Sequence, residues 1–84
     1  MSAALPKVRI VERLLGRERA LGSAWQGEGL VEVDPRQPEP ERLDTVVHEL
    51  LRHMEPDWDE DRVEQAAGWL ARALWQEGYR RVLL

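Results

Sequence analysis

The sequence predicts an α+β fold in which a small antiparallel β-sheet of about three strands packs on two antiparallel helices. Short apolar runs separated by glycines fill the first half of the chain, and two long stretches with helical spacing fill the second. Three prolines at positions 35, 38 and 40 divide the halves. Each helical stripe must be buried against another layer, and 84 residues suffice for one domain. We therefore expect a single domain over residues 1–84.

Composition narrows the class of protein. With 16 acidic and 12 basic residues the net charge is -4, so no basic surface for nucleic acid is expected. The chain has no cysteine, which leaves His, Asp and Glu as its strong metal ligands. No apolar run approaches the ~20 residues of a membrane span, and the N-terminus lacks the apolar core of a signal peptide. These features indicate a soluble, cytoplasmic protein, whose partner we expect to be a protein or peptide.

The strands are expected in the first half. Residues 7–15 alternate apolar and charged side chains, which predicts the first strand. Residues 17–21 fit a helical turn and a loop equally well. Two β-rich runs within residues 23–34 flank a pair of glycines, which predicts a hairpin.

The first helix is the most strongly patterned element. The prolines prevent a helix before Pro40, which itself suits the first helical position. From Glu41 onward the apolar spacings are 3, 1, 3, 1 and 3, which is one stripe of an α-helix: Leu43, Val46, Val47, Leu50, Leu51 and Met54. Leu50 lies close to the centre of this stripe, so we expect it to be buried. Pro56 ends the helix.

A second helix is expected from about Trp58 to Glu77. Asp57 and Glu60 form a capping box at its start, and Gly78 occupies the position of a left-handed C-cap. Its apolar stripe contains several alanines, which allow a close approach to the first helix: Val63, Ala66, Ala67, Leu70, Ala73 and Leu74. The remaining tail, residues 79–84, is expected to dock or to add a strand.

Both histidines of the chain lie in the first helix, in the run His-Glu-Leu-Leu-Arg-His. A zinc peptidase helix carries His-Glu-x-x-His, but here Arg52 holds the place of the second histidine. At about 100° per residue, His48 and Arg52 lie about 40° apart, whereas His53 lies about 140° from His48. Two histidines about 7.5 Å apart along a regular helix do not readily share one zinc. A π-bulge that absorbs one residue would bring His53 into position.

The order of motifs resembles that of small zinc metallopeptidases of phages and bacteria. The shared order is a strand, a hairpin ending in Val-Asp-Pro-Arg, a helix with Thr-Val-Val-His-Glu-Leu-Leu, Pro-Asp, and a helix ending in Ala-Leu-Trp-Gln-Glu-Gly-Tyr-Arg. The resemblance covers most of the chain and implies a minimal zincin-like fold. It implies that His48 is the first zinc ligand and Glu49 the general base. For the third ligand it implies an acid on the next helix, with Glu64 as first candidate and Glu60 as second.

A narrower resemblance bears on the second histidine. Dipeptidyl peptidase III enzymes bind zinc with His-Glu-Leu-Leu-Gly-His, whose histidines have the spacing of His48 and His53. The first hypothesis is thus a peptidase in which these two histidines and Glu64 hold zinc, while Glu49 takes a proton from the bound water. Because Arg52 interrupts the motif, we expect a degenerate site with weak or no activity, in which Arg52 replaces the metal by pairing with Glu49 and an acid of the second helix.

The tryptophans suggest a second class of function, a metal-free interaction module. Trp58 is expected to anchor the junction of the two helices. Trp69 and Trp75 lie about 110° off the apolar stripe on opposite sides. Such aromatics either mark a surface that binds a protein, together with the acidic side chains, or are covered by the sheet or the tail.

Overall fold

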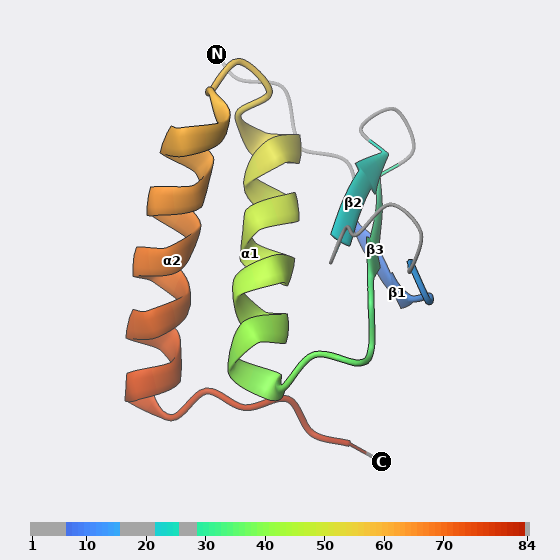
Figure 1. Ribbon diagram of the computed structural model, residues 1–84, viewed down its shortest axis with the longest axis vertical. Helices are drawn as coiled ribbons and strands as arrows, with labels where there is room; N and C mark the ends of the chain where they lie inside the picture. Colours follow the sequence, from blue (N-terminus) through green and yellow to red (C-terminus); the bar gives the residue numbers. More distant parts are fainter. Residues whose placement is uncertain (1–6, 16–21, 26–28, 84) are drawn as a thin grey trace.

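The computed structural model describes residues 7–15, 22–25 and 29–83 (Figure 1). Three strands and two helices follow in order: β1 (Arg9–Glu12), β2 (Gly22–Trp25), β3 (Leu30–Val33), α1 (Glu39–Met54) and α2 (Glu60–Glu77). Helix α1 lies between the sheet and α2, and the two helices run in opposite directions (Figure 1). The molecule is therefore a small α+β structure in which α1 has a neighbour on each side.

The sheet is mixed, with the strand order β1-β3-β2. Strand β2 pairs antiparallel with β3, as a hairpin requires, but β1 pairs parallel with β3. The prediction of an antiparallel sheet is therefore wrong, and the zincin-like fold class that contained it is withdrawn. The alternation of residues 7–15 identifies a strand without specifying its neighbour. Strand β2 runs opposite to β1, and β3 runs opposite to β2, so β3 runs in the same direction as β1 and lies beside it.

The central strand is anchored on both faces. Val31 and Val33 are 0% exposed. Between them, Glu32 accepts two hydrogen bonds from Arg13, at 2.6 Å from Nε and 3.0 Å from Nη2. Asp34, which directly follows β3, accepts a hydrogen bond of 3.1 Å from the Leu15 backbone N–H. It also accepts a bidentate pair of hydrogen bonds from the Arg36 guanidinium. These bonds, those from Arg36 above all, lower the pKa of Asp34 far below its ordinary value.

The ends of α2 agree only in part with those predicted from the sequence. Gly78 has a left-handed φ of 97° and caps the C-terminus, which confirms that prediction. At the other end the cap is Asp59, whose carboxylate accepts the Arg62 backbone N–H at 2.8 Å, and not Asp57. The helix consequently begins at Glu60, two residues later than expected, which places Glu60 itself in the first turn.

Burial along α1 differs from the predicted stripe. Leu51 is 7% exposed and forms a core with Val63 and Ala67 of α2, against which Trp58 also packs. Leu50, expected at the buried centre, is only half-buried. The reason is that α1 is covered from two sides, so its most buried positions are Leu51, at one edge of the stripe, and two polar residues beyond the other edge, Thr45 and Glu49.

Neither helix in the described part of the chain combines the length and hydropathy that a membrane span requires.

Candidate functional site

One carboxylate joins the two helices at the predicted motif. Glu60 Oε1 lies 2.9 Å from His48 Nε2, and Glu60 Oε2 accepts a hydrogen bond from Arg52 Nη2. His48 and Arg52 reach the same acid because they are one helical turn apart on the same face of α1. Glu60 is available because the short connection from Met54 to Asp59 sets the first turn of α2 beside them. The carboxylate thus bridges a histidine and an arginine.

Glu49 lies on the side of α1 that packs against the sheet. It is 7% exposed, and its Cγ is so close to β2 that a Cβ on Gly22 would lie 3.0 Å from it. Burial raises the pKa of Glu49 above its ordinary value, and the charges of His48 and Arg52 oppose that shift. Arg52 Nε lies 3.6 Å from Glu49 Oε1, so the guanidinium stands between Glu49 and Glu60.

His53 is directed to a different element. Its Nε2 lies 3.4 Å from the carbonyl oxygen of Leu30 in β3. A carbonyl oxygen only accepts, so His53 can take part in this contact only as a donor through Nε2. Helix α1 is α-helical throughout Glu39–Met54, without a π-bulge. The structure therefore does not bring His48 and His53 together.

The donor set does not fit zinc. Within the described residues, no group of three or more His, Asp or Glu side chains is placed to hold a metal ion. Of the acids proposed as third ligand, Glu60 contacts His48, whereas Glu64 is an exposed residue one turn further along α2. A zinc peptidase site needs three protein ligands and an open position. Here the second position is a fixed cation, Arg52, which already binds Glu60.

Among the residues that the structure describes, one small hollow opens beside the bridge. The hollow beside Arg52 and Glu60 has a volume of about 40 Å³, which suits a bound water better than a peptide side chain. It is lined by Arg52, Glu55, Pro56, Trp58, Glu60 and Val63. The chemistry open to the group is electrostatic: Arg52 places one positive charge between two carboxylates, one buried and one exposed.

The structure also places the two tryptophans considered as a partner surface. Trp69 is 66% exposed on α2. Trp75 is half-buried, and the Arg80 guanidinium stacks on its ring with Cζ 3.3 Å from the centroid. Sequence reasoning missed this second arginine site. Its available signal was the pair Arg80-Arg81, which follows the helix-ending Gly78 after one residue, Tyr79.

No known protein family, no curated protein and no solved structure matches the chain.

Proposed function

We propose that the chain carries a degenerate metallopeptidase-like site, with Arg52 in place of the zinc ion, and has weak or no peptidase activity. The observation that carries this proposal is the position of the Arg52 guanidinium between Glu49 and Glu60. Arginine stays protonated at every physiological pH, so no proton loss vacates the position. A zinc ion would have to displace a charge-assisted bond from Glu60 before it could bind there.

Calorimetric titration with zinc tests the proposal. The wild type should bind zinc no more tightly than about 10 µM. Arg52→His restores His-Glu-x-x-His and should bind at least about ten times more tightly, because a neutral ring nitrogen then replaces the cation one turn from His48.

Two double variants identify the acid that binds zinc in Arg52→His. Adding Glu60→Ala to Arg52→His should remove most of the gained affinity, whereas adding Glu64→Ala should leave it unchanged. His53→Ala alone should leave the zinc affinity of the wild type unchanged. If the wild type binds one zinc tightly and His53→Ala abolishes that binding, the proposal is wrong and the intact-site hypothesis is correct.

A second candidate, a metal-free module that binds a protein or peptide in the cytoplasm, is favoured by the exposure of Trp69. An aromatic residue that is 66% exposed on a helix is unusual away from binding surfaces. Selection of displayed peptides on the wild type, followed by counter-selection on Trp69→Ala, tests this function. Peptides that require Trp69 would support it, and failure to enrich any would count against it.

A further inference from the structure

The stripe of α1 is left partly open near the start of the helix. At about 100° per residue, buried Leu51 lies about 80° to one side of Leu43, toward α2, and buried Glu49 lies about 120° to the other side, toward the sheet. Leu43 and Val46 lie between these two contacts and are only half-buried. Neither neighbour of α1 covers this part of its apolar surface completely.

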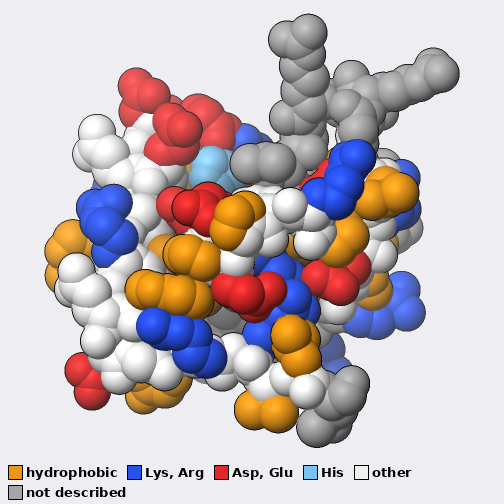
Figure 2. Space-filling view, turned by 60° about the horizontal axis from the view of Figure 1, so that its bottom comes forward, with side chains coloured by type: hydrophobic (Ala, Val, Ile, Leu, Met, Phe, Trp, Pro, Cys, Tyr) orange, Lys and Arg blue, Asp and Glu red, His pale blue; other side chains and the backbone are white. Residues whose placement is uncertain are grey.

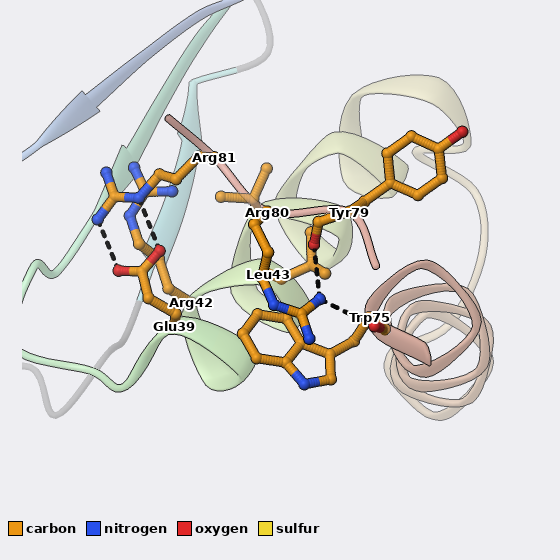
Figure 3. Close-up of a pocket in the computed structure, with 8 residues that line it drawn as sticks. Glu39, Arg42, Leu43, Trp75, Tyr79, Arg80 and Arg81 are labelled. Atoms are coloured by element: carbon orange, nitrogen blue, oxygen red, sulfur yellow. Dashed lines mark hydrogen bonds and ion pairs between the residues drawn. The ribbon is translucent and has the colours of Figure 1, made fainter. Parts of the chain in front are cut away.

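A cavity of about 260 Å³ occupies this position, between the start of α1, the end of α2 and the tail that follows α2 (Figure 3). It is lined by Glu39, Arg42, Leu43, Val46, Trp75, Tyr79, Arg80 and Arg81. Figure 2, in which this end of the molecule is turned forward, shows hydrophobic side chains interleaved with basic and acidic ones. The volume lies below the ~300 Å³ at which drug-sized sites begin, so the cavity suits a group about as large as one amino-acid residue.

The charge of the lining is opposite to that of the whole chain. Three arginines and one glutamate line the cavity, whereas the chain carries a net charge of -4. Two of these arginines have acidic partners. Arg81 binds Glu39 through two bonds of 2.8 Å, and Arg42 Nε lies 3.0 Å from Glu12 Oε2 (Figure 3 draws the first pair).

Arg80 differs from both. Its Nη1 donates to the backbone oxygens of Trp75 and Tyr79, at 2.8 and 2.9 Å, and its plane stacks on the Trp75 ring. Among the residues that the structure describes, no carboxylate pairs with it. These bonds use Nη1 alone and leave the N–H groups on Nε and Nη2 unused. Together these two nitrogens form the edge of a guanidinium that binds a carboxylate in bidentate geometry. Stacking holds the guanidinium in place before any ligand arrives.

We propose that this cavity binds a hydrophobic carboxylate. The carboxylate accepts hydrogen bonds from Nε and Nη2 of Arg80, and the attached aromatic or branched apolar group covers Leu43 and Val46. A free small acid and the carboxyl-terminal residue of a peptide share this chemistry. The site is separate from the His48 cluster, since at about 100° per residue His48 lies about 140° around α1 from Leu43 and about 160° from Val46.

Titration followed by two-dimensional NMR of the labelled protein tests the assignment, with N-acetylphenylalanine as the probe and its neutral amide as the matched ligand. The acid should shift the resonances of Leu43, Val46 and the Trp75 indole in a saturable way and should bind at least about ten times more tightly than the amide. A peptide ending in phenylalanine separates the two sources. Tighter binding of the peptide indicates a protein terminus, and tighter binding of the small acid a free ligand.

The matched variants are Arg80→Gln and Arg62→Gln, because Arg62 also stacks on a tryptophan, with Cζ 4.3 Å from the Trp58 centroid, at the far end of α2. Arg80→Gln should weaken binding of the acid about tenfold and leave binding of the amide unchanged, while Arg62→Gln should change neither affinity. Equal affinity for acid and amide would overturn the proposal. So would equal effects of the two variants, or shifts confined to another surface.

Discussion

At Gly22, β2 lies close against α1, and replacing this glycine with alanine tests how Glu49 comes to be buried. A Cβ at this position would lie 2.6 Å from Thr45 Cγ2, 3.0 Å from Glu49 Cγ and 3.2 Å from the Glu32 carbonyl oxygen. Carbon atoms in contact prefer about 3.5–4.0 Å, so the first distance is short by about 1 Å. Strand and helix would have to separate, or Thr45 would have to move.

The magnitude follows from two opposing effects. Overpacking of this kind costs about 1–3 kcal/mol. Alanine also restricts the unfolded chain, which returns about 0.4–1 kcal/mol. Among the described residues the glycines with positive φ are Gly29 and Gly78, so backbone strain adds nothing at Gly22. We expect Gly22→Ala to lower the free energy of unfolding by about 1–2 kcal/mol.

Urea unfolding followed by circular dichroism measures this change, with Gly68→Ala as the matched control. Gly68 lies inside α2, and the nearest atom to its added Cβ is Arg72 Nη1 at 3.3 Å, the end of a flexible exposed side chain. The same substitution should therefore stabilise there by about 0.5–1 kcal/mol, because alanine is the better helix former.

A double variant locates the collision. Thr45→Ser removes Cγ2 but keeps Oγ1, which donates to Gln37 Oε1 at 2.8 Å. In the Gly22→Ala background it should recover about 1 kcal/mol, whereas alone it should cost about that much. The recovery should be partial, since the contact with Glu49 remains. Gly22→Ala within about 0.5 kcal/mol of the wild type, or no coupling to Thr45→Ser, would refute the close approach.

Two further predictions concern α1. Burial raises the pKa of Glu49, so the folded state holds the carboxyl proton more tightly than the unfolded state does. The stability that this gives is fully present below the ordinary pKa of glutamate. It is lost as the pH rises through the higher pKa of the folded state. The stability of Glu49→Gln relative to the wild type should therefore increase between pH 4 and pH 7 in urea melts, and a constant difference would contradict the shift. Leu51→Ala should cost about 2–5 kcal/mol and Leu50→Ala clearly less, and the reverse order in the same assay would mean that the sequence-predicted stripe is the buried face.

Local patterns predicted the helices well and the sheet poorly, for a physical reason. The stop at Pro56, the C-cap at Gly78 and the 3.6-residue spacing depend on neighbours within one turn of the chain. The direction of β1 depends on where β3 lies after two intervening segments, which no local pattern encodes. Leu50 was misjudged for a related reason: a stripe shows which face is apolar, but two neighbours of α1 decide which positions are covered.

The candidate site divides in the same way. The shared face of His48 and Arg52 follows from helix geometry and was predictable. The identity of the acid that they contact was not, because it depends on the residue at which α2 begins. The resemblance implied only an acid on the next helix, with Glu64 ahead of Glu60, whereas the cap at Asp59 sets Glu60 in the first turn and Glu64 is exposed.

The charge around each arginine explains why the two ends of α1 support different proposals. At the His48 end, the cation of Arg52 meets two carboxylates, of which the buried Glu49 depends on it most, since an unpaired buried charge is costly. An added metal ion would bring a second cation to acids that already have one. At the other end, Arg80 meets backbone carbonyls and an aromatic face but, among the described residues, no acid. The balance there is completed by an anion from outside the chain, and for this reason we assign ligand binding to the cavity that no motif marks.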